Sequence, residues 1–391
     1  MQLYCRSSFR IPYPFLPSSS LLLFPFPLSP RILAACLSSK RRLRFSGNTN
    51  KTLEDTLCWV GEIKVLLLSE HEIAELLSIE QVMDVVENAF REKALGYAQM
   101  PPKVYLNFSK YNGDVRAMPA YLERLDLASV KIVNSHPENP KKFNMPTVSA
   151  TVLLLDPRNG ALLSIMGGNN ITAMRTAAAG GIAAKYLAKR TSKTASFIGA
   201  GVQARAQLLA LLAIFPNLEE IRVCDIIPEA GEAFAALAKN KAPQSRIVIV
   251  GNEKRAVHEA DIVVTTTPSK KPLVLEPWVS EGTHFNCIGA DAPLKEELDP
   301  AILKSAKIVV DDWEQASHSG EINVPLSRDI LFQKDVWGEL GDIIVGRKPA
   351  RTSDKEITIF DSTGLAIQDA ATVELVYRKA LSKKIGCFVI I

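Results

Sequence analysis

The sequence has few of the residues that form disulfide frameworks or metal sites. None of its six cysteines forms a C-x-x-C pair, and three of them fall before residue 60. The other three, Cys224, Cys287 and Cys387, are widely spaced, and the five histidines show no metal-ligand spacing. We therefore expect no disulfide framework and no metal, and a reducing compartment is favoured.

Acidic residues are missing from the N-terminal stretch. Residues 1–53 hold eight Lys or Arg and no Asp or Glu, so setting them aside leaves 38 basic against 42 acidic residues. A mildly acidic body without a basic stripe argues against nucleic acid as a partner. Prolines interrupt the apolar part of residues 1–47 too often for a membrane-spanning helix, so no membrane partner is expected either.

The same stretch is rich in Ser and Arg, which is typical of an organelle transit peptide. The alternative is non-native sequence read from an upstream start. Either way, residues 1–60 are interpreted as an N-terminal extension outside the fold. We expect a cytoplasmic protein, with organellar import if the extension is native.

A content of 47% hydrophobic and 23% charged residues lets 391 residues bury one large or two ordinary cores. From Ile63, a short strand precedes helical periodicity, with Ser69 and Ser78 placed as N-caps. Short strand-like runs separated by Gly, Pro and Asn then predict an antiparallel or mixed sheet. An Ala-rich helix over 169–190 follows, and its small residues predict close packing against a neighbour.

At Thr194 the pattern changes to alternating strands and helices, which predicts a doubly wound α/β sheet of about six strands. The strand "TASFI" leads into G-A-G-V-Q-A, from Gly199 to Ala204, and then into a helix. This is the dinucleotide fingerprint: Gly199 permits the turn, Gly201 lets the backbone approach a pyrophosphate, and the helix N-terminus offers N–H groups to the anion. A dinucleotide-binding domain is therefore predicted.

The second strand of this region indicates which dinucleotide binds. It ends at Asp225, 21 residues after Ala204, where a carboxylate receives the ribose hydroxyls. That carboxylate would face the extra phosphate of NADP, and no Arg follows in "DIIPEA" to bind the phosphate. NAD is the predicted cofactor.

A lone carboxylate, Asp291, follows the fifth strand of the sheet in "GADAPLKEE". Small neighbours let a ligand approach the backbone there, although an acid in such a turn can also simply cap the next helix. Open α/β sheets bind ligands at the carboxyl ends of their strands, and this position favours a functional role.

Several stretches resemble the ornithine cyclodeaminase/mu-crystallin family, and most closely its archaeal-type alanine dehydrogenase branch. They are "VKIVNSHPENP", "GAGVQA", "TTTPSKKPLV", "EGTHFNCIGADAPLKEELDP", "VVDDWEQASHSGEINVPLS" and "ITIFDSTGLAIQDAA". The resemblance implies a homodimer in which a Rossmann NAD-binding domain, 191–317, is inserted in a discontinuous α+β substrate-binding and dimerisation domain, 61–190 and 318–391.

The resemblance also implies roles for individual residues. Lys131 and Asp291 match catalytic residues, and Lys103, Arg116 and Lys131 match handles for the substrate carboxylate. Without the family, Lys131 would be taken for a snorkelling surface lysine and Arg175 for a helix-surface arginine. The implied cofactor-binding residues are Arg175, Gly199, Gly201, Val202, Gln203, Asp225, Ile226, Ile227, Thr266, Thr267, Gly289, Ala290, Asp291, Lys295 and Ser362.

Two positions depart from the family pattern. Gly167 stands where an acidic residue is common, and Leu294 stands where the family usually has Gly. Gly167 removes a charge near the site. Leu294 adds bulk beside the catalytic loop, and its backbone conformation is expected to be one that Gly prefers.

The predicted activity is reversible oxidative deamination of a small L-amino acid, L-alanine giving pyruvate and ammonia, with Asp291 kept ionised by nearby cations. Ornithine cyclodeamination to L-proline and ammonia, ketimine reduction, and non-enzymatic small-molecule binding of the mu-crystallin type are the alternatives. Release of proline without net NADH would indicate the cyclodeaminase, and a preference for NADPH would indicate the ketimine reductase. Failure of every amino acid to give NADH would indicate the binding protein.

Overall fold

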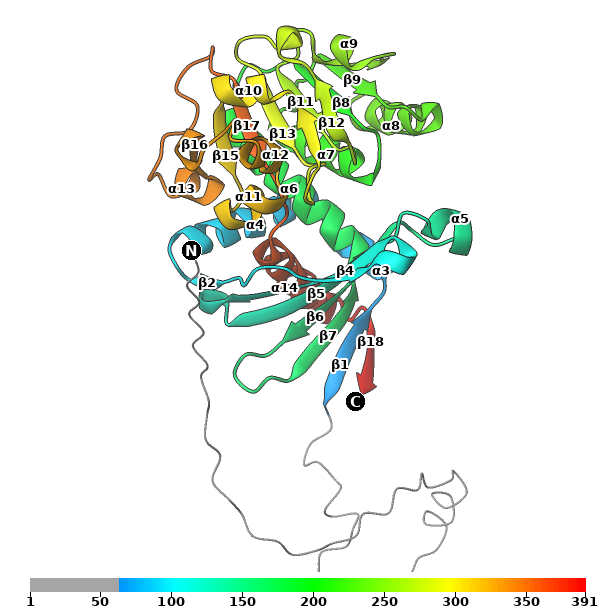
Figure 1. Ribbon diagram of the computed structural model, residues 1–391. Coiled ribbons are helices and arrows are strands. Elements are labelled where there is room, and N and C mark those ends of the chain that lie inside the picture. Colours follow the sequence, from blue (N-terminus) through cyan, green and yellow to red (C-terminus); the bar gives the residue numbers. More distant parts are fainter. Residues whose placement is uncertain (1–62) are drawn as a thin grey trace, which may run out of the picture. The chain divides into compact units, whose positions relative to one another are not determined.

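Two eight-stranded sheets organise the protein (Figure 1). The structure, a computed structural model, describes residues 63–391. The predicted extension over residues 1–60, with its interpretation as a transit peptide, lies outside the described residues.

The first sheet has the strand order β18-β1-β7-β6-β5-β4-β2, with β3 paired to β4. Its neighbours pair antiparallel except for the parallel pair β1 and β7, as the expected mixed sheet requires. The strands are β1 (Lys64–Leu68), β2 (Ala98–Gln99), β3 (Val104–Phe108), β4 (Gly113–Leu122), β5 (Leu127–Ser135), β6 (Val148–Leu155), β7 (Leu162–Gly167) and β18 (Cys387–Ile390).

The second sheet is parallel throughout and has the order β10-β9-β8-β11-β13-β17-β15-β16. Its strands are β8 (Thr194–Ile198), β9 (Glu220–Cys224), β10 (Arg246–Ile249), β11 (Ile262–Thr265), β13 (His284–Cys287), β15 (Lys307–Val310), β16 (Val336–Glu339) and β17 (Thr358–Asp361). A separate pair consists of β12 (Lys270–Val274) and β14 (Glu296–Leu298). The reversal of strand order between β8 and β11 is that of a doubly wound dinucleotide fold.

The second sheet extends further along the chain than predicted. The sequence placed its end near residue 317 with about six strands, but β16 and β17 belong to it, and β17 lies between β13 and β15. Every residue of β17 is buried and pairs in parallel register with both neighbours. The returning chain therefore completes the nucleotide sheet before it rejoins the first sheet through α14 (Ala366–Lys383).

Helices cover the sheets and connect them (Figure 1). Their bounds, besides α14, are α3 (Glu70–Leu76), α4 (Ile79–Ala94), α5 (Asn139–Phe143), α6 (Asn169–Leu187), α7 (Val202–Ile214), α8 (Pro228–Lys241), α9 (Glu253–Val257), α10 (Pro300–Ser305), α11 (Trp313–Ser319), α12 (Asn323–Ser327) and α13 (Leu340–Ile344). Ser69 and Ser78 cap α3 and α4 as expected.

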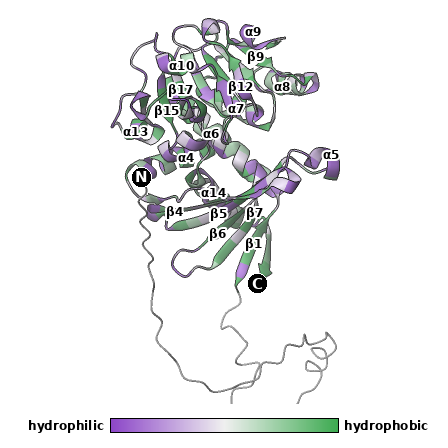
Figure 2. Cartoon of the chain, in the orientation of Figure 1, coloured by the Kyte–Doolittle hydropathy of each residue, from purple (hydrophilic) through white to green (hydrophobic). Residues whose placement is uncertain are grey.

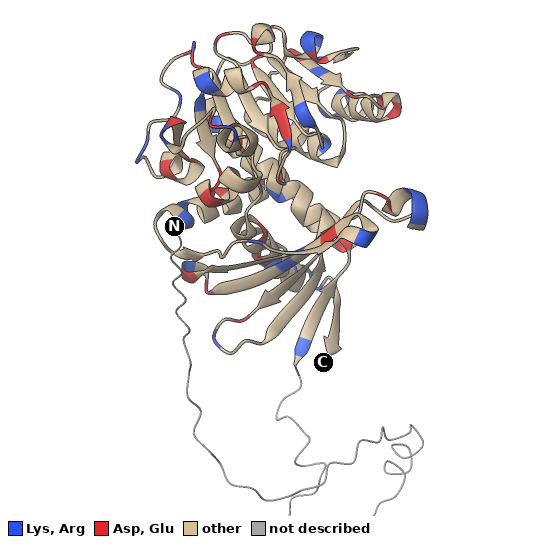
Figure 3. Ribbon diagram, viewed as in Figure 1, with Lys and Arg blue, Asp and Glu red and all other residues tan. Residues whose placement is uncertain are grey.

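One hydrophobic core runs from the first sheet into the second through α6 and α14. It includes Met166, Ala177 and Ala370 together with Val309 of β15 and Phe360 of β17. The small residues of α6 allow the close packing on α7 that the sequence predicted. Figure 2 shows hydrophobic residues concentrated in the strands, and Figure 3 shows charges mainly on outlying helices and loops such as α5.

Across residues 63–391, the helices are too short or too polar to span a bilayer.

Candidate active site

The turn after β8 is open toward the carboxyl edge of the second sheet. Gly199 has a φ of 93°, and a Cβ at this position would lie 2.7 Å from Oγ1 of Thr266. A Cβ at Gly201 would have no contacting atom within 4 Å. Gly201 is the N-cap residue of α7, and it has no side chain to accept from the amides of the first turn. Backbone that is exposed beside free helix N–H groups fits a pyrophosphate.

Asp225 follows β9 and supports this turn. One of its oxygens accepts a hydrogen bond from the Ala200 amide at 2.7 Å, and the other accepts one from the Ile227 amide at 2.8 Å. Asp225 is half-buried, and the adjacent Ile226 is 92% exposed. This placement fits recognition of ribose hydroxyls.

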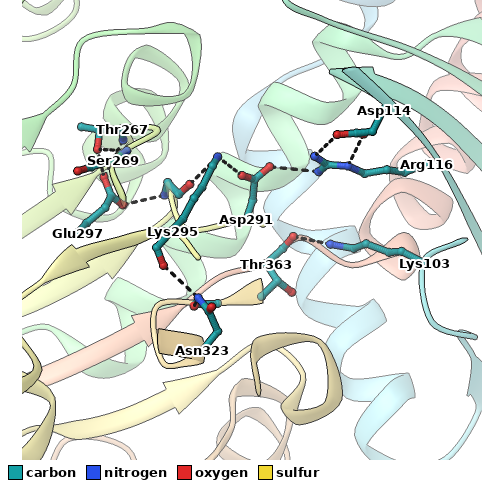
Figure 4. Close-up of polar contacts among 12 residues, drawn as sticks. Lys103, Asp114, Arg116, Thr267, Ser269, Asp291, Lys295, Glu297, Asn323 and Thr363 are labelled. Carbon is teal, nitrogen blue, oxygen red and sulfur yellow. Dashed lines mark hydrogen bonds and ion pairs between the residues drawn. The ribbon is translucent and has the colours of Figure 1, made fainter. Parts of the chain in front are cut away.

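The other predicted cofactor residues gather at the same edge, because they follow the parallel strands β11, β13 and β17. Glu297 of β14 ties two of these loops together: its Oε1 accepts from the Thr267 amide at 2.7 Å, and its Oε2 accepts from the Gly289 amide at 3.0 Å (Figure 4). Among the described residues, the buried Oγ of Ser362 and Oε1 of Gln203 have no hydrogen-bond partner, which fits polar ligand atoms at this edge.

Asp291 lies between two cations (Figure 4). The Nζ atom of Lys295 is 2.5 Å from Oδ1 of Asp291, and Nη1 of Arg116 is 3.4 Å from Oδ2. Burial opposes ionisation of this carboxyl, but the charges of Lys295 and Arg116 outweigh it and lower the pKa of Asp291. The side chain keeps 42% of its surface exposed, so the ionised carboxylate is accessible.

Arg116 comes from β4 of the first sheet, so the Asp291 contact joins the two sheets. Asp114 accepts from Nε of Arg116 at 2.8 Å and from Nη2 at 3.2 Å, and the guanidinium also lies 5.4 Å from the ring centroid of Tyr105. These three contacts fix the plane of the guanidinium and leave Nη1 directed at Asp291.

Lys131, on β5, is 1% exposed and pairs with Asp369 of α14. Its Nζ is 2.8 Å from Oδ2 of Asp369, while Nε of Arg175 is 3.1 Å from Oδ1 of the same carboxylate. Burial and the charge of Arg175 lower the pKa of Lys131 to about 7, although Asp369 opposes the change. A lysine with such a pKa exchanges protons near neutral pH.

The ammonium of Lys103 interacts with charged groups of both sheets. Its Nζ donates to the Thr363 carbonyl at 2.8 Å. Burial lowers the pKa of Lys103 to about 8, the charges of Asp311 and Asp291 oppose this, and those of Arg175 and Arg116 add to it. In contrast to Arg116 and Lys131, no carboxylate of the described residues forms an ion pair with Lys103 within 4.0 Å.

The structure thus brings Lys103, Arg116, Lys131, Asp291 and Lys295 into one charged cluster. Arg175 is buried and contacts Asp369 and Gln368, which accepts from its Nη1 at 2.9 Å. The sequence interpretation missed several members that hold this cluster, although they lie within or beside the quoted motifs. They are Asp311, Glu297, Asn323, Thr363, Gln368 and Asp369.

Both departures from the family pattern have a local explanation. Beside Gly167, the carboxyl of Glu70 from α3 accepts from the amides of Asn169 at 2.7 Å and Asn170 at 3.0 Å, so an acid from another helix caps α6. A Cβ at Gly167 would lie 2.8 Å from that carboxyl. Leu294 has a φ of 67°, the left-handed conformation expected where Gly is usual.

A parallel sheet with a glycine-rich turn, an acid after its second strand and a charged cluster at its carboxyl edge defines the class of Rossmann dinucleotide-binding proteins. No trio of His, Cys, Asp or Glu within residues 63–391 is arranged to hold a metal ion. The pattern of the ornithine cyclodeaminase/mu-crystallin family matches residues 63–384, so the chain belongs to that family, as the quoted motifs suggested.

Individual proteins and solved structures of this family are similar to the chain. The chain is 49% identical to alanine dehydrogenase of Archaeoglobus fulgidus over 324 residues, 83% of this chain and 98% of that protein. An archaeal alanine dehydrogenase dimer with bound NAD matches with a TM-score of 0.80, 49% identity and coverage of 83% and 99%. Thermococcus litoralis Δ1-pyrroline-2-carboxylate reductase, in complex with NADH and L-proline, matches with a TM-score of 0.80, 40% identity and coverage of 83% and 100%.

Proposed function

We propose that the protein is an NAD-dependent amino-acid dehydrogenase that reversibly deaminates a small L-amino acid, L-alanine giving pyruvate and ammonia. The observation that carries the proposal is the ionised Asp291, held between Lys295 and Arg116 at the carboxyl edge of a dinucleotide-binding sheet. The 49% identity to an alanine dehydrogenase supports the choice of substrate.

The turn at Gly199 and Gly201, the N-terminus of α7 and Asp225 would hold NAD, and Ser362 and Gln203 each offer it a buried polar atom. When bound, NAD supplies the acceptor for the hydride that leaves the substrate Cα. Asp225 favours NAD over NADP because a 2′-phosphate would meet its negative charge.

The chain's own residues hold the substrate and move protons. Lys103 and Arg116 bind the substrate carboxylate, and the Asp291 carboxylate accepts hydrogen bonds from the substrate nitrogen and from the water that attacks the imine. Nζ of Lys131, with its pKa lowered to about 7, accepts a proton from that water during deamination and returns it in the reverse reaction.

Initial rates of NADH formation across a panel of L-amino acids, with products identified by mass, test the activity. Asp291→Asn is expected to lower kcat by about 10²-fold because it removes the charge that orients the reacting groups, and to leave the Kd for NAD unchanged. Asp299→Asn, which removes a charge at the cap of α10 but keeps the capping acceptor, is the matched control with normal kcat. A loss below about threefold in Asp291→Asn would contradict the role.

Reduction of a cyclic imine carboxylate is the second candidate, and the 40% identity to a pyrroline-carboxylate reductase favours it. Its substrate carries the same carboxylate and a nitrogen at the same position, so the same cluster would serve. A higher kcat/KM with Δ1-pyrroline-2-carboxylate and NADH than with pyruvate, ammonia and NADH would select it.

We also propose that two copies associate, as in the archaeal alanine dehydrogenase dimer, through the apolar face of the first sheet. Val104 and Leu106 of β3 and Ile132 of β5 share that face and are exposed by 58%, 59% and 43%. The cytoplasm is the proposed location, consistent with the scattered cysteines, and fractionation of cells that express the full chain tests it.

A further inference from the structure

Asp311 is a fully buried carboxylate that the proposed reaction does not use. It follows β15 at the carboxyl edge of the second sheet, beside the loop 362–364 that follows β17. Because Val310 and Asp361 pair in register, both segments leave the sheet at the same level. The two segments lie far apart in the sequence but meet beside the charged cluster.

Asp311 directs its side chain to this one loop. Its Oδ2 accepts from the amides of Thr363 at 2.7 Å and Gly364 at 2.8 Å, and its Oδ1 accepts from Oγ1 of Thr363 at 3.0 Å. Three donors from two consecutive residues define the loop's conformation. Burial raises the pKa of Asp311 to about 6, and the charge of Lys103 opposes this rise, so the carboxylate is ionised at neutral pH.

The loop in turn contacts two cations of the site. The carbonyl of Thr363 accepts from Nζ of Lys103 at 2.8 Å (Figure 4). Gly364 lies against the guanidinium of Arg175 so closely that a Cβ there would overlap it. Any shift of residues 363–364 would therefore displace the only protein acceptor given to the Lys103 ammonium among the described residues.

Resting on the proposed function, we propose that Asp311 is a positioning residue for recognition of the substrate carboxylate: it anchors residues 363–364, whose carbonyl orients Lys103, and its charge keeps Lys103 protonated. Five charged groups from other elements interact with the Lys103 ammonium. Asp311 after β15 and Asp291 after β13 favour the charged form. Arg175 of α6, Arg116 of β4 and Lys131 of β5 disfavour it.

A measurement that needs no turnover tests the charge effect. The rate at which acetic anhydride labels Lys103, followed by peptide mass spectrometry across pH, gives the titration midpoint of its amine. In Asp311→Asn the midpoint is expected to fall by about one pH unit or more, since a neighbouring negative charge is lost. Asp312→Asn, which removes the neighbouring negative charge and an ion pair with Lys93 but keeps an N-cap acceptor for α11, should leave it unchanged. An unchanged midpoint in Asp311→Asn would overturn the proposal.

Kinetics test the positioning effect. Asp311→Asn should raise KM for L-alanine at least tenfold with little change in the Kd for NAD, and its effect should largely vanish in a Lys103→Met background. Should Asp311→Asn fail to fold, Thr363→Val removes one of the three donors and keeps the charge, so KM should rise about threefold without a shift of the midpoint. Additive effects of Asp311→Asn and Lys103→Met, or a normal KM in Thr363→Val, would contradict the anchoring role.

Different results would contradict the proposed dehydrogenase activity and the proposed role of Asp311. If no amino acid is turned over by the wild-type protein, the proposed dehydrogenase activity is wrong, whereas the labelling midpoint still decides whether Asp311 controls the charge of Lys103.

Discussion

Lys131 has an environment that few lysines share. Its ammonium is almost without solvent contact, and its carboxylate partner, Asp369, also serves Arg175. Burial disfavours the ammonium, and one negative charge between two buried cations cannot fully stabilise both. The amine is therefore the group that yields, and its pKa falls to about 7.

The pH dependence of the two reaction directions should reveal this lysine. Because the neutral amine is the proposed proton acceptor, kcat for deamination is expected to rise as pH increases through about 7. The reverse reaction needs the protonated form, so its kcat should fall over the same interval. Initial rates in both directions between pH 5 and 9 measure the two limbs. Lys131→Met should lose the limb near 7, and a limb that persists in this variant would assign it to another group.

At this scale, the sequence predicted the residues whose roles the family resemblance implies, and it missed the residues of the same motifs that hold them in place. Asp291 and Lys131 stand at strand positions whose neighbours resemble known sites. Asp369 and Asp311 are buried carboxylates whose partners, Lys131 and Thr363, come from elements more than 50 residues away in the chain. No local spacing records such contacts, so only the tertiary structure identifies them.

The loop between β13 and β14 carries both Asp291 and Lys295, and Asn323 from α12 holds its far end. Oδ1 of Asn323 accepts from the Leu294 amide at 3.0 Å, and Nδ2 donates to the Lys295 carbonyl at 3.0 Å. These bonds keep Leu294 in a left-handed conformation that costs an L-residue roughly 1–2 kcal/mol. The strain lies three residues from Asp291, the proposed catalytic carboxylate.

Leu294→Gly is expected to relieve this strain, and Leu294→Ala is not, because alanine keeps the Cβ. The glycine variant should therefore be the more stable of the two by about 1 kcal/mol, the reverse of their order in a helix. Leu294 is 65% exposed, so little packing is lost in either variant. Denaturant unfolding of both proteins measures the difference. Equal stability, or the usual advantage of alanine, would show that the φ of Leu294 is not strained in solution.

On the scale of the whole molecule, the sequence predicted two regions of different architecture but not where the second ends. The strand β8 leads into the fingerprint, and β9, β11 and β13 follow it at regular spacing, so they could be recognised locally. β17 could not be placed in this way, because its position between β13 and β15 depends on pairing with strands 50 and more residues earlier. This insertion joins the carboxyl edge of the second sheet to α14, which packs on the first sheet and pairs its Asp369 with Lys131 of β5.

One face of the first sheet exposes several large apolar side chains. Val104 and Ile132 lie opposite the same residue of β4, Ala117, and therefore project from the same face. Together with Leu106 they form a contiguous apolar surface, which marks an interface in a globular protein. A second copy is the occupant that the proposed dimer requires, and a shared interface on β3, β4 and β5 would stabilise the strands that carry Arg116 and Lys131.

Ile132→Arg is expected to separate the copies, because it places an unpaired charge in the centre of that face, where desolvation costs several kcal/mol. Light scattering after size-exclusion chromatography measures the mass across protein concentrations. Ile249→Arg on β10 is the matched control, since Ile249 is 52% exposed at the edge of the second sheet and should leave the mass unchanged. A dimer that survives in Ile132→Arg at micromolar concentration would place the interface elsewhere, and the positions of Arg116 and Lys131 would then depend on the single chain alone.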